Sequence, residues 1–112
     1  MIRSFRYALR GVAAMIASER SVRIHLAASV LVCAAGLYLG ISVADWCWVV
    51  AAITLVWVAE GLNTALEFLT DLVSPGFHPL AEKTKDIAAG AVLIAVAGAL
   101  AIGAFIFGPY LF

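Results

Sequence analysis

Three long stretches without a charged side chain are the feature that most constrains the fold of this 112-residue chain. Residues 24–44, 46–59 and 87–112 contain no Asp, Glu, Lys or Arg. A helix needs about 20 apolar residues to cross the hydrocarbon core of a bilayer, which is about 30 Å thick. We therefore predict an all-α integral membrane protein, a single unit over residues 1–112, with spans at about 24–43, 46–70 and 87–109.

The overall composition excludes the common alternatives to a membrane protein. Hydrophobic residues make up 65% of the chain, charged residues only 12%, and the mean hydropathy is +1.09. Soluble proteins carry about 25% charged residues, and a small soluble domain needs many polar residues to cover its large surface. The net charge of zero is not that of a strongly basic nucleic-acid binder, so we expect no nucleic-acid partner.

The distribution of basic residues predicts the orientation in the membrane. Lys83 and Lys85 lie between the second and third spans, whereas the expected turn at residues 42–45 and the C-terminal end have no Lys or Arg. Basic loops stay in the cytoplasm, so we expect a multi-pass membrane protein with its N-terminus in the cytoplasm and its C-terminus on the other side. Five arginines precede the first span: Arg3, Arg6, Arg10, Arg20 and Arg23.

The segment of about residues 2–18 has the pattern of an amphipathic helix on the membrane surface. Arg3, Arg6 and Arg10 share one face at i, i+3 and i+7, and Phe5 and Leu9 fall on another. Such a helix lies in the headgroup layer with its basic face toward lipid phosphates. The arginines taken alone are equally well explained as topology anchors.

A polar stripe near the end of the second span is the strongest functional signal. Glu60, Asn63, Glu67 and Asp71 follow at i, i+3, i+7 and i+11, within roughly 80° around a helix. Glu60 is expected roughly 9 Å inside the cytoplasmic boundary and Glu67 at that boundary. A carboxylate within the membrane is a functional candidate, and interhelical hydrogen bonding alone explains four polar residues poorly.

The stripe suits chemistry that joins the lipid phase to water. A buried carboxylate can act as a general base, and carboxylates at the wet end can hold Mg²⁺. Lys83, Lys85 and Asp86 precede the third span, where a Lys can reach a phosphate, and Glu19 lies at the opposite cytoplasmic boundary. The sequence has no GxxxxGK[ST] or GxGxxG motif, so a nucleotide site must be built from helix side chains.

These residues carry a resemblance to a family of small bacterial membrane lipid kinases, the prokaryotic diacylglycerol kinases and undecaprenol kinases. The resemblance covers nearly the whole chain. Its most specific part is the run ExxNxxxExxxD followed by the Lys-Asp pair. The matching segments are Glu60–Glu67 (EGLNTALE), residues 71–73 (DLV), 77–81 (FHPLA), 85–93 (KDIAAGAVL) and 23–26 (RIHL), with Ser4, Phe5, Ala8, Gly11 and Glu19.

The resemblance implies a homotrimeric bundle in the bacterial cytoplasmic membrane, in which each subunit has an N-terminal surface helix and three spans. It implies transfer of the ATP γ-phosphate, with Mg²⁺, to the primary hydroxyl of a membrane lipid alcohol. Glu60 would be the general base, Asn63 would orient the base or the phosphate, and Glu19 and Glu67 would be the metal ligands. The resemblance also implies that Lys85 and Asp86 contact the ATP phosphates, and that the nucleotide is contacted by Tyr7, Gly76, Phe77 and His78. It implies that the lipid is contacted by both Glu60 and Arg23.

The residues within the matching motifs resemble those of undecaprenol kinases more than those of diacylglycerol kinases. The resemblance therefore favours undecaprenol as the acceptor, with undecaprenyl phosphate as the product. The alternative is a diacylglycerol kinase that makes phosphatidic acid. A small proton-coupled membrane transporter built around Glu60 is a more distant alternative, and a non-catalytic membrane subunit would leave the stripe without a purpose. Small residues at i+4 spacing on the third span suggest close helix contacts: Ala91, Ala95, Ala99 and Gly103.

Overall fold

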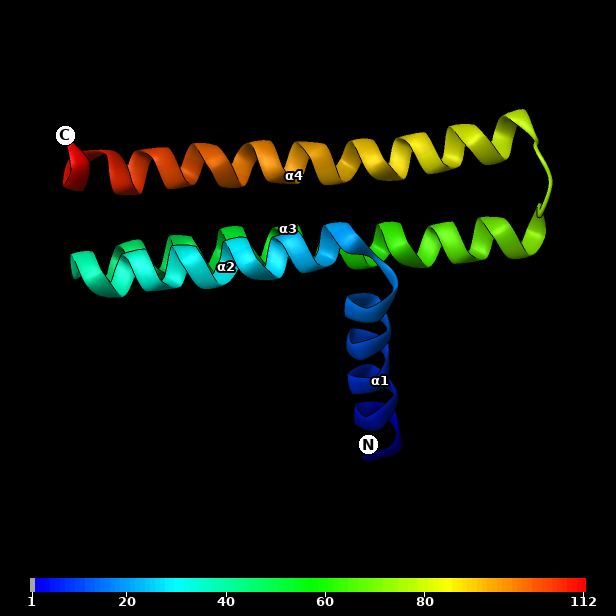
Figure 1. The fold of residues 1–112 in the computed structure, drawn as a ribbon, viewed down its shortest axis with the longest axis horizontal. Coiled ribbons are helices and arrows are strands. Elements are labelled where there is room, and N and C mark those ends of the chain that lie inside the picture. The colour runs from blue at the N-terminus through cyan, green and yellow to red at the C-terminus, as the bar shows by residue number, and fades with distance from the viewer. Residues whose placement is uncertain (1) are drawn as a thin grey trace.

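The computed structural model describes residues 2–112, and every regular element in that range is a helix. Three of the helices are long and apolar enough to cross a membrane, which agrees with the predicted all-α membrane protein. Figure 1 shows the four helices in chain order: α1 (Ile2–Ser18), α2 (Arg20–Leu39), α3 (Val43–Val73) and α4 (Pro79–Leu111).

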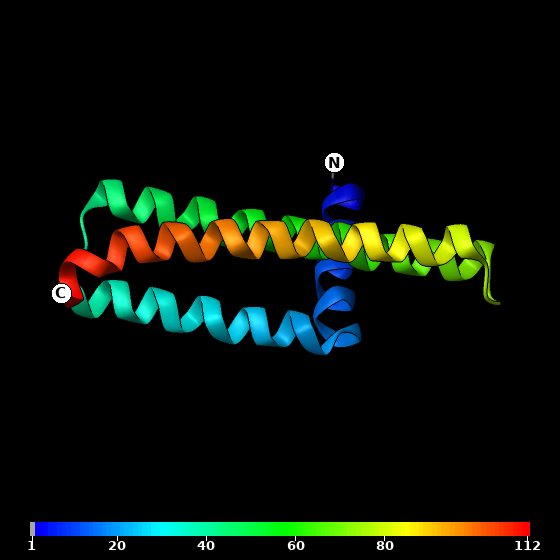
Figure 2. The same cartoon turned by 90° about the horizontal axis from the view of Figure 1, so that it is seen from above.

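The three long helices lie side by side, and α1 runs crosswise to them. In Figures 1 and 2, α3 and α4 form a long antiparallel hairpin, and α2 lies along the part of α3 that is nearer Val43. The α3–α4 hairpin therefore continues past the start of α2 and past α1. One part of α3 therefore lies beside α2, and another part extends beyond it.

The turns follow from local backbone chemistry. Glu19 has an extended backbone (φ −125°, ψ 129°), and this one residue lets the chain change direction between α1 and α2. Gly40 ends α2 in the left-handed conformation (φ 64°), which favours glycine. Ser42 then begins α3 by accepting a hydrogen bond from the Asp45 amide.

These caps correct the predicted position of the first turn. The hydropathy pattern indicated residues 42–45, with Asp45 in the turn, but the structure places the turn at Gly40–Ser42 and Asp45 in the first turn of α3. The charge of Asp45 suggested a loop, whereas a carboxylate is favourable at a helix N-terminus. The Tyr110 hydroxyl donates to Asp45 at 3.0 Å and links the end of α4 to the start of α3.

The core within one chain is thin and lies toward this end of the bundle. Ile41, Val49 and Ile106 form its buried centre. Trp46 packs so closely over Gly36 that a Cβ there would lie 2.7 Å from the indole ring. Many large apolar side chains elsewhere are exposed, among them Leu37 and Phe105, as expected for helices that face lipid or another subunit.

Candidate active site

The Glu60 carboxylate is buried between α3 and α2, with only 3% of the residue exposed. The Ser21 hydroxyl donates to Glu60 Oε1 at 3.0 Å, and His25 Nε2 lies 3.3 Å from Oε2. Ser21 and His25 are four residues apart, so they share the face of α2 that meets α3. Each carboxylate oxygen thus has one polar partner, as a buried charge requires.

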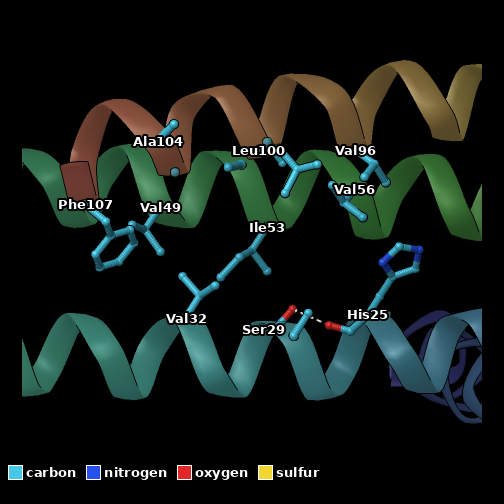
Figure 3. A pocket seen from close by; sticks show the side chains of 14 residues that line it. His25, Ser29, Val32, Val49, Ile53, Val56, Val96, Leu100, Ala104 and Phe107 are labelled. Atoms are coloured by element: carbon cyan, nitrogen blue, oxygen red, sulfur yellow. Dashed lines mark hydrogen bonds between the residues drawn. The ribbon is translucent and has the colours of Figure 1, made fainter. Parts of the chain in front are cut away.

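An apolar cavity begins next to this cluster. It has a volume of about 350 Å³ and lies between α2, α3 and α4. Figure 3 shows His25 at one end of the cavity, with Val32 and Phe107 toward the other. The lining is otherwise almost entirely hydrocarbon, so the cavity suits an alkyl or prenyl chain whose polar end lies near His25.

Asn63 is also buried but faces a different neighbour. It is 8% exposed, and its Oδ1 atom is buried without a hydrogen-bond partner. Asn63 lines a second groove, of about 750 Å³, between α3 and α4, together with small residues such as Ala88 and Ala91. The predicted stripe therefore spreads over two sides of α3, since Glu60 meets α2 and Asn63 meets the α4 groove.

Glu67 and Glu19 form a carboxyl pair at the joint between α1 and α2. Their side chains lie within hydrogen-bonding reach of each other, and both are half-buried. Across residues 2–112, no group of three or more His, Cys, Asp or Glu side chains converges as a ready metal cage. Mg²⁺ in phosphoryl-transfer sites is held by one or two carboxylates plus substrate phosphates, so this repulsive oxygen pair fits that ion.

Asp71 and Lys85 form an ion pair between α3 and α4, with Lys85 Nζ 2.6 Å from Asp71 Oδ1. Lys85 precedes the charge-free span, and its hydrogen bond to Asp71 raises the pKa of the ammonium group above the ordinary value. The pair borders a cleft of about 190 Å³ beneath the α3–α4 loop. Among the residues predicted to meet ATP, the cleft gathers Gly76, Phe77, His78 and Lys85.

Three of the predicted site residues do not reach these clusters within one chain. Tyr7 is exposed on α1, where the Arg10 guanidinium lies 5.5 Å from its ring. Asp86 is exposed on α4 and does not border the cleft. Arg23 is exposed, and its guanidinium donates to the Ala17 carbonyl at 3.4 Å.

The partners of Glu60 were not predicted from the sequence. Ser21, His25 and Ser29 recur every four residues on α2, so they form a short polar stripe on an otherwise apolar helix. This spacing is the signal that could have indicated them. Trp57 of α3 extends the contact by donating to Ser29 Oγ at 3.1 Å.

Together, the clusters define a class of protein. A buried carboxylate beside a hydrocarbon cavity can activate a lipid hydroxyl, and the carboxyl pair and Lys85 lie farther along the same helical hairpin, where a polyphosphate can enter. Phosphoryl transfer requires mainly positioning and charge neutralisation, which these residues supply. The arrangement is that of a membrane-embedded phosphotransferase.

Comparison with known proteins narrows this class to a family. Residues 6–107 match the family described as prokaryotic diacylglycerol kinase, so the chain belongs to this family of membrane lipid kinases, which use ATP as phosphoryl donor. It is 37% identical over 109 residues to an undecaprenol kinase of Bacillus subtilis, covering 97% of this chain and 89% of that protein. It is 40% identical over 107 residues to a diacylglycerol kinase of Synechocystis, covering 95% of this chain and 61% of that protein. A diacylglycerol kinase of Escherichia coli is 27% identical over 96 residues, or 86% of this chain and 79% of that protein.

Proposed function

We propose that this lipid kinase phosphorylates the primary hydroxyl of undecaprenol, with Glu60 as the general base. The observation that carries the proposal is the burial of the Glu60 carboxylate against His25, the residue at one end of a hydrocarbon cavity. The match to an undecaprenol kinase over nearly the full length of both chains supports this acceptor. Diacylglycerol is the second candidate, because diacylglycerol kinases match as well.

Glu60 would take the proton of the acceptor hydroxyl while the hydroxyl oxygen attacks the γ-phosphorus, and the bond from that phosphorus to the β–γ bridging oxygen would break to release ADP. Ser21 donates to Oε1 and His25 Nε2 lies 3.3 Å from Oε2, so each carboxylate oxygen keeps a lone pair for the acceptor. The cavity would hold the part of the tail next to the reacting hydroxyl. An apolar wall also excludes water, which would otherwise compete as the phosphate acceptor.

The phosphates would lie at the other end of the polar stripe. Glu19 and Glu67 would hold Mg²⁺, which when bound neutralises charge on the phosphates. Glu67 lies about 10 Å along α3 from Glu60, a separation that a triphosphate can bridge. Lys85 can donate to a phosphate without leaving Asp71, because an ammonium has three hydrogens. The remaining proposed contacts with ATP come from Asn63, Asp86, Tyr7 and the loop residues Gly76, Phe77 and His78. Arg23 completes the proposed contacts with the lipid.

We further propose a homotrimer in the cytoplasmic membrane with three equivalent sites at the subunit interfaces, α1 on the cytoplasmic surface and the C-terminus outside. The exposed apolar faces and the unpaired Asn63 Oδ1 support contacts beyond one chain. The small residues of α4 divide between two surfaces, since Ala91 and Ala95 line the Asn63 groove while Ala99 and Gly103 line the cavity. Steps of four residues turn by about 40°, so such a stripe drifts around the helix.

The acceptor is tested by presenting undecaprenol and diacylglycerol side by side. Purified protein in mixed micelles receives labelled ATP and Mg²⁺ with both lipids at equal surface concentration. We expect kcat/KM for undecaprenol to exceed that for diacylglycerol by at least about 10-fold, which is within reach of differential burial of a few methylenes. Equal use, or preference for diacylglycerol, contradicts the assignment of the acceptor but not the kinase activity.

The role of Glu60 is tested with Glu60→Gln, which keeps the size of the side chain but cannot take a proton. We expect kcat to fall by at least about 10²-fold, the scale of a general base, with ATP affinity unchanged. Asp45→Asn, which neutralises a carboxylate in the first turn of α3, far from the proposed site, is the matched control and should keep its turnover. Near-normal turnover in Glu60→Gln would exclude Glu60 as the base.

The metal site is tested by Mg²⁺ titrations of Glu19→Gln and Glu67→Gln. Each variant loses one of the two proposed carboxylate ligands, so we expect the Mg²⁺ concentration for half-maximal activity to rise about 10-fold or more, while KM for the lipid stays constant. Asp45→Asn removes a carboxylate at the opposite end of α3 and should leave the titration unchanged. An unchanged metal requirement in both Glu variants would place the ion elsewhere.

Sharing of sites between subunits is tested by mixing Glu60→Gln with Glu19→Gln under conditions that exchange subunits, at an Mg²⁺ concentration too low for Glu19→Gln to turn over by itself. If Glu19 of one chain serves Glu60 of another, some interfaces in mixed trimers receive both intact residues and activity returns. Subunit exchange is measured separately with two fluorescent labels. Mixtures that exchange fully but remain inactive would show that each site belongs to one chain.

A further inference from the structure

His25 is the polar residue that lies between the Glu60 carboxylate and the apolar cavity. Its Nε2 atom is 3.3 Å from Glu60 Oε2, and 20% of its side chain remains exposed. Figure 3 shows the ring at the end of the cavity nearest the start of α2. An acceptor that enters the cavity and reaches Glu60 therefore meets the imidazole on its way.

We propose that His25 is a positioning residue of the kinase site. Its Nε2–H donates to Oε2 of Glu60 and, together with Ser21 on Oε1, holds the plane of the carboxylate. This inference rests on the proposed role of Glu60 as the general base. A carboxylate that is free to rotate about its last torsion would present its lone pairs to the hydroxyl only part of the time.

The direction of the hydrogen bond follows from the groups that face His25. An ionised carboxylate only accepts, so an attractive contact requires a hydrogen on Nε2. Across the described lining of the cavity that His25 borders, the other polar group is the Ser29 hydroxyl of α2, and the groups from α3 and α4 are hydrocarbon, among them Val56, Val96 and Leu100. Glu60 is therefore the charged group that sets the orientation of the ring.

The backbone that carries His25 is itself fixed against α3. Ser29 Oγ donates to the His25 carbonyl at 2.8 Å and accepts from Trp57 Nε1 at 3.1 Å. Val22, one turn before this contact on α2, is fully buried with no exposed area. The imidazole thus projects from a rigid turn of α2, which is what a residue that positions another side chain requires.

The proposal predicts different activities for two amide replacements of His25, because their amide nitrogens extend to different positions. In His25→Gln the amide nitrogen can occupy the place of Nε2, whereas in His25→Asn it reaches only the place of Nδ1. We expect His25→Asn and His25→Leu to lower kcat by about 10-fold to 10²-fold, the cost of misplacing a reacting group by roughly 1 Å. His25→Gln should recover kcat to within about threefold of the wild type, because one good hydrogen bond is restored. KM for MgATP should stay unchanged in all three variants.

The outcomes distinguish the positioning role of His25 from the proposed role of Glu60 as the general base. Unchanged kcat in His25→Asn and His25→Leu, with Glu60→Gln inactive, overturns the role of His25 alone. Equal loss in His25→Gln and His25→Asn also overturns it, because the donor position would then be irrelevant. Should His25→Leu fail to fold, as judged by helical content and thermal unfolding in micelles, the comparison of the two amides decides. An active Glu60→Gln refutes the general base and, with it, the positioning role.

Discussion

A single carboxylate in the apolar part of α3 imposes conditions on the rest of the molecule. An ionised group out of water costs several kcal/mol unless polar partners surround it. Glu60 is 3% exposed, and both of its partners come from α2. The tight turn at Gly40–Ser42 folds α2 back along α3 and makes this possible. The contact between Trp57 and Ser29 continues the same interface, so burying one charge specifies how two helices pack.

The length of α3 then connects two environments. Its 31 residues begin in the thin core, to which its own Trp46 contributes, and end beyond the start of α2. A straight helix holds Glu60, Glu67 and Asp71 at fixed heights, spread over about 16 Å. The bend at Glu19 brings a second carboxylate to the middle of that range. A rigid helix can therefore keep an acceptor site in hydrocarbon and a phosphate site near water at a constant separation.

The sequence predicted elements better than it predicted contacts. The charge-free stretches indicated three long apolar helices because hydrocarbon tolerates few charged residues. The helix ends differ from the predicted spans, since Gly40 ends α2 early and α4 begins at Pro79, ahead of the charged residues that precede its apolar stretch. The polar stripe indicated one face of α3, and Glu60 and Asn63 are both buried. Periodicity gives the face of a helix but not the helix that covers it. Ser21 and His25 therefore emerged only with the packing, as did the division of Ala91 and Gly103 between two surfaces.

What one chain leaves unsatisfied supports the proposed assembly. A buried acceptor such as Asn63 Oδ1 costs about 1–3 kcal/mol when it has no donor. The groove around it is wide and lined by alanines, so a helix of another subunit could approach closely and supply that donor. Tyr7 and Arg23 lie apart from the cleft and the cavity of their own chain. A neighbouring chain that fills the Asn63 groove could also bring its Tyr7 and Arg23 side chains to a site of the first chain, although they do not reach the site of their own chain. For this reason we propose that the sites are shared between subunits.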